Sequence, residues 1–278
     1  MSATKTLKIE KATPTVGAEV LDVDLDRVLN DEDLPQAVMA AAEEHGALLF
    51  RELRLDDETQ AAFCKKMGEV VSFSGYPIPE VMVITLDPGN PNAEYFKGNV
   101  QWHIDGTQDA RPAKATLLTA HVVSDEGGET GFASTYAAYD DLSDEEKERL
   151  ASLRVVHSLE AILRPVYDDP TPEQLEKWKS RGSKELPLVW THQSGRKSLV
   201  LGATADYVVG MDAEEGRALM KDLLDRATTP DRVFEHTWTV GDVVIWDNTG
   251  TVHRAMPFDP ASGREMHRTT WVGDEEVQ

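Results

Sequence analysis

The chain has 278 residues, of which 28 are Lys or Arg and 50 are Asp or Glu, giving a formal net charge of -22. This charge disfavours binding to a phosphate backbone or an anionic membrane, so we expect neither a nucleic-acid nor a membrane partner. An anionic small molecule would need a site built from a few well-placed cations. Because all-β barrels and sandwiches of this length often form one domain, we expect a single domain over residues 1–278.

Cysteine content and the N-terminus bear on the compartment. Cys64 is the only cysteine, so neither an intrachain disulfide nor a zinc site built on several thiolates can form. The first 20 residues carry charges where a signal peptide would need an apolar core, and no run of about 18 apolar residues occurs. These features predict a cytoplasmic protein.

The predicted elements fall into two parts along the chain. Residues 7–25 alternate apolar and polar side chains around Gly17, which is typical of a hairpin or bent strand. Two amphipathic helices, 31–46 and 55–70, flank a buried strand at 47–53. Short strand patterns separated by turn residues then cover 81–86, 114–123, 128–134, 154–159, 187–192, 198–202, 234–247 and 267–273. Helical patterns interrupt them at 135–152, 171–180 and 212–228. The pattern predicts a mainly β fold with flanking helices, a sandwich or jelly roll with an open mouth.

The stretch "QWHIDGT" places His103 and Asp105 two residues apart. On a strand, such side chains project to one face with Cα atoms about 6.5–7 Å apart, so both could reach one ion. For the pair alone, an ordinary hydrogen-bonded surface pair is the favoured interpretation. His253, which follows an apolar run and a turn, supplies a second imidazole, unless it is a capping or core histidine. Two histidines and one carboxylate form a facial triad that binds ferrous iron and leaves positions open for co-substrate and oxygen.

Two arginines follow His253 in "GREMHR". Arg264 and Arg268 are four residues apart, so on a strand their side chains would point to the same side. A guanidinium binds a carboxylate or sulfonate through two hydrogen bonds, which a lysine cannot match. Beside a candidate metal ligand in an acidic protein, this pair indicates anionic ligands. Surface ion pairs with Asp or Glu are the alternative.

The motifs "WHIDGT", "GGETGFAS", "IWDNTGTVHRA" and "GREMHRTTW" occur in this order. With "PLVWTHQSGRKSLVLG" between them, most of the chain resembles the Fe(II)- and 2-oxoglutarate-dependent dioxygenases of the TauD/TfdA family. The resemblance implies a double-stranded β-helix, or jelly roll, with iron held by His103, Asp105 and His253. It also implies 2-oxoglutarate as co-substrate and O2 as oxidant. Oxidative decarboxylation to succinate and CO2 then accompanies hydroxylation of the substrate, whose product can fragment. Because the carboxylate ligand is retained, halogenation is not expected.

The resemblance also assigns roles to further residues. Thr130 in "GGET" and Arg264 match the residues that anchor the distal carboxylate of 2-oxoglutarate. Arg268 matches the arginine that reaches the anionic group of the substrate. Asn99 matches a position that lines the substrate pocket and contacts 2-oxoglutarate. Trp246 matches an aromatic residue packed near the iron, although plain core packing would explain it as well.

The substrate is the least determined part of the resemblance. In "VVSFSGYPIPEV", where the taurine enzyme has a pocket histidine and tyrosine, this chain has Ser74 and Tyr76 with no histidine between them. We therefore do not expect taurine, whereas Arg268 favours a carboxylate, a sulfonate or a sulfate ester. Residues 158–186 are expected to form a lid insertion over the mouth. An apolar wall suited to an aryl or alkyl body is expected from Leu159, Ile162 and Leu163.

Other readings of the metal triad remain open from the residues themselves. A zinc-dependent hydrolase would need a general base near the metal, for which Asp109 and Glu129 are the nearby candidates. A cupin-like binding protein would need no redox chemistry. Neither accounts for Thr130, Arg264 and Arg268 together. The remaining histidines are expected to be structural or surface residues: His45, His121, His157, His192, His236 and His267. The family resemblance further implies a homo-oligomer, a dimer or tetramer.

Overall fold

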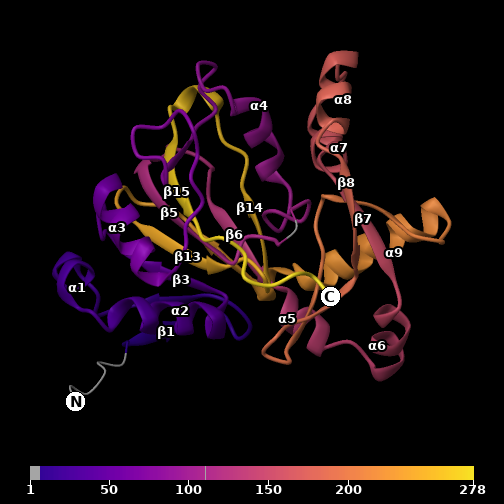
Figure 1. Ribbon diagram of the computed structural model, residues 1–278, viewed down its shortest axis with the longest axis horizontal. Helices are drawn as coiled ribbons and strands as arrows, with labels where there is room; N and C mark the ends of the chain where they lie inside the picture. Colours follow the sequence, from indigo (N-terminus) through magenta and orange to yellow (C-terminus); the bar gives the residue numbers. More distant parts are fainter. Residues whose placement is uncertain (1–6, 110) are drawn as a thin grey trace.

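A seven-stranded sheet forms the larger layer of the protein, whose computed structural model describes residues 7–109 and 111–278 (Figure 1). Its strands, in spatial order, are β1 (Ile9–Lys11), β2 (Ala18–Val20), β3 (Ala47–Phe50), β13 (Val243–Asp247), β5 (Ala115–Val122), β15 (Glu265–Thr270) and β4 (Met82–Ile84). Neighbouring strands run antiparallel, except that β2 and β3 are parallel. The order brings the last strands of the chain between strands from its first half.

Three smaller sheets complete the β structure. One contains β12 (Val233–His236), β6 (Thr130–Ser134) and β14 (Thr251–Ala255). A second contains β11 (Ala205–Val208), β7 (Arg154–Ser158) and β8 (Ser183–Pro187), and a two-stranded ribbon pairs β10 (Lys197–Leu199) with β9 (Val189–Thr191). The first of these sheets faces the seven-stranded sheet.

Helices connect and cover these sheets. They are α1 (Leu25–Asn30), α2 (Leu34–His45), α3 (Asp57–Met67), α4 (Ala93–Phe96), α5 (Thr135–Asp140), α6 (Asp144–Ala151), α7 (Leu159–Leu163), α8 (Pro172–Lys179) and α9 (Ala213–Ala227). Single 3₁₀ turns lie at Lys97–Val100, Arg164–Val166, Pro230–Arg232 and Pro260–Ser262. Several helices begin where the sequence offers a cap: Ser143 with Glu146 and Thr171 with Gln174 form capping boxes.

The space between the two facing sheets is filled by apolar side chains. Phe132 of β6 packs there with Leu118 of β5, Trp246 of β13 and Met266 of β15. Leu118 and Met266 are even-numbered. Because side chains alternate along a strand, the even-numbered residues of β5 and β15 face the interior. Two antiparallel sheets closed over a shared core in this way form the expected jelly roll, a mainly β fold with flanking helices.

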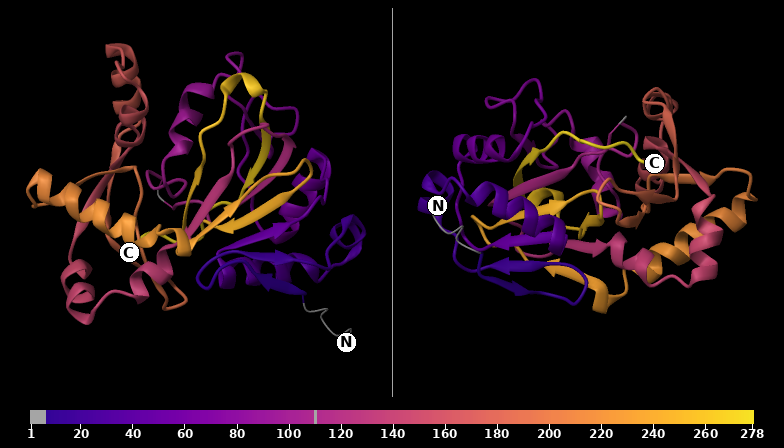
Figure 2. Two further views of the ribbon diagram at one scale, coloured as in Figure 1. Left: turned by 180° about the vertical axis from the view of Figure 1, so that it is seen from behind. Right: turned by 60° about the horizontal axis from the view of Figure 1, so that its bottom comes forward.

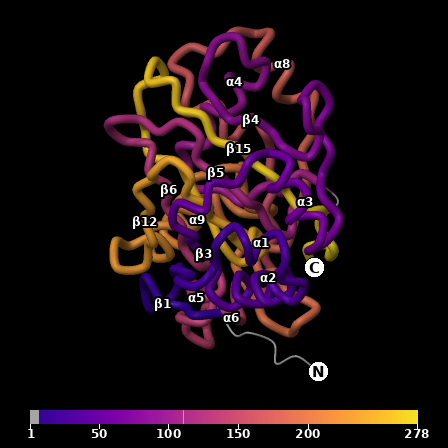
Figure 3. Tube along the Cα trace, turned by 90° about the vertical axis from the view of Figure 1, so that its left-hand side faces the viewer, coloured from indigo at the N-terminus to yellow at the C-terminus, as the bar shows by residue number. Residues whose placement is uncertain are grey.

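The opposite face of the large sheet is covered by the N-terminal helices. Leu117, one residue from the inward-facing Leu118, packs outward in a cluster with Val38 of α2 and Phe63 of α3. Gln60 of α3 reaches the same face, donating a hydrogen bond to Thr269 Oγ1 at 3.0 Å. Figure 3 shows α1, α2 and α3 together over this side of the molecule. The large sheet is therefore buried on both faces.

The segment expected to form a lid, 158–186, is a helical excursion between two paired strands. β7 and β8 run antiparallel, with Ser158 opposite Ser183, and α7 and α8 lie between them in the chain. In Figures 1 and 2 the two helices stand as a column beside the main sheets, on the same side as α9. Leu163 and Trp178 hold the helices together in a small apolar cluster.

The predicted helices and most predicted strands are present, with shifted ends. The pattern at 135–152 is two helices, α5 and α6, and the one at 234–247 is two strands, β12 and β13, on different sheets. Sequence reasoning missed α1, α4, α7 and the strands β8, β11 and β14. Each has at most six residues, which is too short for a periodic pattern to emerge.

The turn between β13 and β14 has no room for a side chain at Gly250. A Cβ there would lie 1.7 Å from Cε2 of Tyr136. We predict that Gly250→Ala lowers the free energy of unfolding by about 1–3 kcal/mol, because the ring or the hairpin must move. Urea denaturation measures this change. Gly216→Ala on α9 is the matched control, since its Cβ would make an ordinary 3.4 Å contact with Val208 and alanine favours the helix. Equal stability of Gly250→Ala and the wild type would contradict the packing described here.

Candidate active site

The site begins where two distant segments pair through their backbones. His103 and His253 form an isolated antiparallel bridge, in which each N–H donates to the other residue's carbonyl oxygen at 3.0 Å. His253 lies in β14, but His103 belongs to no strand, and Asp105 begins a turn. The prediction of a strand carrying His103 and Asp105 is therefore wrong. Gly106, with φ of +77°, turns the chain directly after Asp105 and brings its carboxylate back toward the imidazoles.

The three predicted metal ligands converge at this bridge. His103 Nε2 lies 3.8 Å from Asp105 Oδ1, and His253 Nε2 lies 3.7 Å from Asp105 Oδ2. One donor atom from each residue falls within 4.8 Å of the other two. Asp105 Oδ2 is buried and has no hydrogen-bond partner among the described residues. An unsatisfied carboxylate oxygen between two imidazole nitrogens is the arrangement that a divalent cation would satisfy.

Both imidazoles are prepared to act as neutral ligands. His103 Nδ1 donates to the carbonyl oxygen of Gln101 at 2.7 Å, which leaves the lone pair on Nε2 facing Asp105. Burial lowers the pKa of His253 to about 3, and the neighbouring His103 ring acts in the same direction. The ring of Trp246 packs against His253 with centroids 4.7 Å apart. This contact fits the predicted position of Trp246 near the metal, and Trp246 is also part of the core.

Arg268 is the nearest cation to the triad. Its NH1 lies 3.6 Å from Asp105 Oδ2, and its NH2 donates to Met82 Sδ at 3.3 Å. Burial is the largest single influence on the pKa of Asp105 and would raise it, but the Arg268 guanidinium, the two imidazoles and Thr116 together hold that pKa below its ordinary value. Arg268 Nε is buried without a partner among the described residues. The side chain therefore keeps unused donors beside the metal ligands.

Asn248 holds the Asp105 turn in place, and sequence reasoning missed it. Its Oδ1 accepts a hydrogen bond from Asp105 N at 2.9 Å, while its Nδ2 donates to the carbonyl oxygens of Asp105 and Ala113, both at 2.9 Å. The side chain is fully buried. One amide thus fixes the backbone of the carboxylate ligand to the β13–β14 turn, five residues before His253. An Asn in a "DNTG" turn gives no sequence signal of such a contact.

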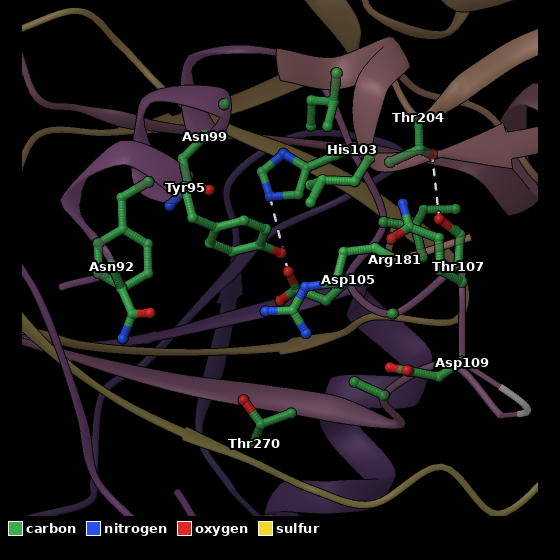
Figure 4. Close-up of a pocket in the computed structure, with 18 of the residues that line it drawn as sticks. Asn92, Tyr95, Asn99, His103, Asp105, Thr107, Asp109, Arg181, Thr204 and Thr270 are labelled. Atoms are coloured by element: carbon green, nitrogen blue, oxygen red, sulfur yellow. Dashed lines mark hydrogen bonds and ion pairs between the residues drawn. The ribbon is translucent and has the colours of Figure 1, made fainter. Parts of the chain in front are cut away.

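A cavity of about 600 Å³ opens beside the triad and is lined by His103, Asp105 and Arg268. Figure 4 shows the side chain of Tyr95, from α4, entering this space with its hydroxyl directed toward Asp105. The residue is 46% exposed through its ring, whereas burial of the hydroxyl end and the nearby Asp105 raise its pKa. Tyr95 was not predicted because α4 is a single short turn. It is placed to contact whatever lies between the metal ligands and the lid.

Residues of the segment 158–186 supply the other wall of the cavity. The three apolar residues expected there, Leu159, Ile162 and Leu163, all line it. Arg181, which follows α8, and Arg111 lie at its exposed rim. Figure 4 shows Arg181 close to Thr107, whose hydroxyl donates to Thr204 Oγ1 at 3.2 Å. The cavity therefore combines an apolar side with several cations, in a chain of strongly negative net charge.

Thr130 and Arg264 lie deeper than the cavity lining. Arg264 is 5% exposed and donates through NH2 to the carbonyl oxygen of Gly128 at 3.0 Å. Thr130, two residues further along the same segment, accepts a hydrogen bond from Trp238 Nε1 at 2.9 Å. Burial lowers the pKa of Arg264 to about 10, and within residues 7–109 and 111–278 no carboxylate lies within salt-bridge distance of its guanidinium. Its cation is therefore available to a buried anion.

The strand parity predicted for the two arginines applies only to Arg268, because β15 begins at Glu265 and Arg264 precedes it. Met266 packs in the core between the sheets, and Arg268, two residues further along β15, lines the cavity. His267 faces the other way, as expected, and contacts Asp57 on α3. A bulge in β5 opposite Glu265 and Met266 leaves the alternation of β15 intact.

The structure brings only some of the predicted substrate residues to the cavity. Asn99, in the 3₁₀ turn before His103, lines it. Ser74 is exposed, and Tyr76 accepts a hydrogen bond from the Nδ2 of Asn92, which does line the cavity. The prediction that Ser74 and Tyr76 line the pocket therefore needs correction. Val71 and Phe73 from the same stretch line the cavity instead.

Most remaining histidines have structural contacts. His157 pairs with Thr204 Oγ1, and His192 with Glu275 and Ser198. His236 lies 3.1 Å from Asp242. Asp109, a base candidate for the hydrolase reading, lines the cavity, and burial raises its pKa. Glu129, the other candidate, does not line it and instead acts electrostatically on Arg264.

A jelly roll with two histidines and one carboxylate at its mouth defines the class of non-haem iron oxygenases. The chain belongs to the family described as "Taurine catabolism dioxygenase TauD, TfdA family", whose model matches residues 8–270. It is a dioxygenase that depends on Fe(II), 2-oxoglutarate and O2. The hydrolase and cupin-like readings of the triad are therefore not retained.

Individual relatives agree with this placement. The (S)-phenoxypropionate/alpha-ketoglutarate-dioxygenase of Sphingobium herbicidovorans is 32% identical over 85% of each chain. An alkylsulfatase of Acinetobacter baylyi is 32% identical over 98% of this chain and 86% of its own. The crystal structure of AAD-2 in complex with Mn(II) and N-oxalylglycine is 31% identical, with a TM-score of 0.82 over 98% of this chain and all of the other. The fold is thus shared along nearly the whole chain.

No helix within the described residues is both long enough and apolar enough to cross a membrane.

Loss of the Asn248 side chain should weaken metal binding although no metal-ligating residue is changed. We predict that Asn248→Ala lowers the affinity of the triad for Fe(II), or Mn(II) as a substitute, about 10- to 100-fold, because the Asp105 turn is released. Metal titration of the metal-free protein measures the dissociation constant. Asn30→Ala is the control, since Asn30 is exposed and bonds only Asp26. An unchanged dissociation constant for Asn248→Ala would contradict the positioning role.

Proposed function

We propose that this dioxygenase hydroxylates a small anionic organic substrate with iron held by His103, Asp105 and His253. The observation that carries the ligand assignment is the buried Oδ2 of Asp105, which has no hydrogen-bond partner among the described residues and lies 3.7 Å from His253 Nε2. Iron bound there would supply the O2 chemistry that amino-acid side chains lack. The reaction consumes substrate, 2-oxoglutarate and O2, and yields the hydroxylated substrate, succinate and CO2.

We assign the distal carboxylate of 2-oxoglutarate to Arg264 and Thr130. A buried guanidinium without a carboxylate partner has lost its hydration, and a bound carboxylate would compensate for that loss. The Thr130 hydroxyl accepts from Trp238 and still has its own proton to donate. Holding one end of the keto acid in this way directs its other end to the metal in a single orientation.

We assign the anionic group of the substrate to Arg268, which lines the cavity and whose Nε has no hydrogen-bond partner among the described residues. The apolar wall of Leu159, Ile162 and Leu163 suits an aryl or alkyl body. A carboxylate, a sulfonate or a sulfate ester fits these two features, and relatives named for phenoxypropionate and alkyl sulfates support this class. Where the hydroxylated carbon bears an ether or ester oxygen, the product fragments.

The remaining assignments complete the proposal. Asn99 contacts substrate and 2-oxoglutarate, and Trp246 limits rotation of the His253 ring. Tyr76 acts only through Asn92, and Ser74 has no role in binding. Residues 158–186 serve as a lid on one functional domain spanning 1–278. The protein works in the cytoplasm as a dimer or tetramer, without nucleic-acid or membrane partners, which its charge of -22 supports.

Removing the Arg264 guanidinium should abolish binding of 2-oxoglutarate while leaving the metal site intact. In an anaerobic titration of metal-free protein with Fe(II) and then 2-oxoglutarate, the wild type should develop a weak visible charge-transfer band that needs both ligands. Arg264→Ala should require at least about 100-fold more 2-oxoglutarate, because a buried charged hydrogen bond contributes about 2–5 kcal/mol. Arg264→Lys is the companion variant, since it keeps the charge but not the two-pronged geometry. Absence of the band in the wild type, with tight zinc binding, would refute the oxygenase chemistry.

Changing Arg268 to leucine should separate substrate binding from co-substrate binding. We predict that Arg268→Leu lowers kcat/KM for an anionic substrate at least about 100-fold, measured as substrate-dependent succinate release. Its charge-transfer titration with 2-oxoglutarate should match the wild type. Its metal affinity should not fall, because the variant removes a cation that competes for Asp105. Loss of 2-oxoglutarate binding in this variant would mean that the roles of the two arginines are exchanged.

A further inference from the structure

A second cluster of metal-ligating side chains lies on the outer face of the large sheet, outside the dioxygenase site. It consists of Asp57 in the first turn of α3, His121 near the end of β5, and His267 in β15. In Figure 1 the three elements lie side by side, with α3 next to β5 and β15. Because β15 alternates, His267 points away from the barrel interior that Arg268 enters. The two clusters are therefore on opposite faces of the same strand.

The donor atoms of this second cluster already lie close together. His267 Nδ1 is 2.5 Å from Asp57 Oδ1, and His121 Nε2 is 4.0 Å from the same oxygen. One donor atom from each residue falls within 4.8 Å of the other two. Ligands about 2.0–2.1 Å from a tetrahedral ion lie roughly 3.4 Å from one another, so the two distances to Asp57 Oδ1 would need to change by less than about 1 Å.

The protonation of the cluster also suits a metal. His267 Nε2 lies 3.1 Å from Glu265 Oε1, and donation there would leave Nδ1 as the coordinating nitrogen. A carboxylate behind a ligating histidine is the usual support of a metal-bound imidazole. His121 Nε2 is buried and has no hydrogen-bond partner among the described residues. Burial lowers the pKa of His121, so its ring stays neutral.

A purely structural contact explains less of this arrangement. An ion pair between His267 and Asp57 would need only those two residues. It leaves the buried Nε2 of His121 without a hydrogen-bond partner among the described residues. An ion between the donors would satisfy this nitrogen, once the His121 ring tilts out of its stack on His267. Two imidazoles and one carboxylate suit zinc and its neighbours in the first transition row, rather than calcium or magnesium.

We propose that Asp57, His121 and His267 bind a second divalent transition-metal ion, with Glu265 orienting His267. The site is half-buried at the sheet surface, so solvent water completes the coordination. The ion would join α3 to β5 and β15. Since β15 and its approach carry Arg264 and Arg268 on the other face, the ion would stiffen the strand that holds both proposed anion ligands.

Metal stoichiometry tests this proposal independently of dioxygenase activity. Calorimetric titration of the metal-free protein with Zn²⁺ should give two ions per chain. His121→Ala should give one, and it should fold normally, because His121 Nε2 makes no hydrogen bond to the described residues and the side chain is 30% exposed. His103→Ala should also give one, and His103→Ala combined with His121→Ala should give none. A wild type that binds one ion, or a His121→Ala variant that still binds two, would overturn the proposal.

Two further variants test whether the loss of a zinc ion could instead come from misfolding or from zinc bound to surface histidines. Asp57→Asn should also bind one ion, as His121→Ala does, because an amide is a poor ligand for zinc. If both variants lose one ion, misfolding of a single variant cannot explain the loss. His45→Ala, which removes an imidazole outside both clusters, should keep two ions. The Fe(II) and 2-oxoglutarate charge-transfer band should persist in His121→Ala. Loss of one ion in His45→Ala as well would show adventitious zinc binding to surface histidines and would overturn the proposal.

Discussion

The reciprocal backbone hydrogen bonds between His103 and His253 are the constraint on which the active site depends. They join a loop to strand β14 at a single residue pair. The two imidazoles therefore start from backbone positions directly opposite each other. Asp105 completes the set only because the chain turns at Gly106 and is held by Asn248. Positions fixed by backbone pairing are rigid, and such rigidity lets a metal site keep its geometry while substrates come and go.

The two arginines of the site, Arg264 and Arg268, lie in different electrostatic environments. Arg268 faces the cavity and the carboxylate ligand, whereas Arg264 is buried behind it with a lowered pKa. Within a chain of net charge -22, Arg268 lies on β15 and Arg264 immediately before that strand, with the core residue Met266 between them. The two cations therefore lie at different depths. Residues 158–186 add an apolar wall and the rim cation Arg181.

The sequence predicted this site where the signal lay in residue types and even spacing. Two histidines with a carboxylate, and two arginines of equal parity, needed no knowledge of tertiary contacts. The contributions of Tyr95 and Asn248 could not be predicted, because one lies on a single helical turn and the other acts through backbone atoms 143 residues away. Ser74 and Tyr76 failed since the exit direction of a loop is not encoded in a periodic pattern. The proximity of His121 to Asp57 on α3 and His267 on β15 could not be predicted either, because it depends on tertiary contacts.

The Asn248 amide has a consequence for the order in which the protein matures. Its contacts close a loop of 143 residues, which costs conformational entropy. The contacts therefore form only when the folding of both sheets offsets that cost. The unfolded chain therefore offers no assembled set of iron donors, and the metal cannot guide early folding. Iron enters a finished chain, so its full binding free energy adds to the stability of the native state alone. Cellular iron supply would then set how long each molecule resists unfolding, as well as how many are active.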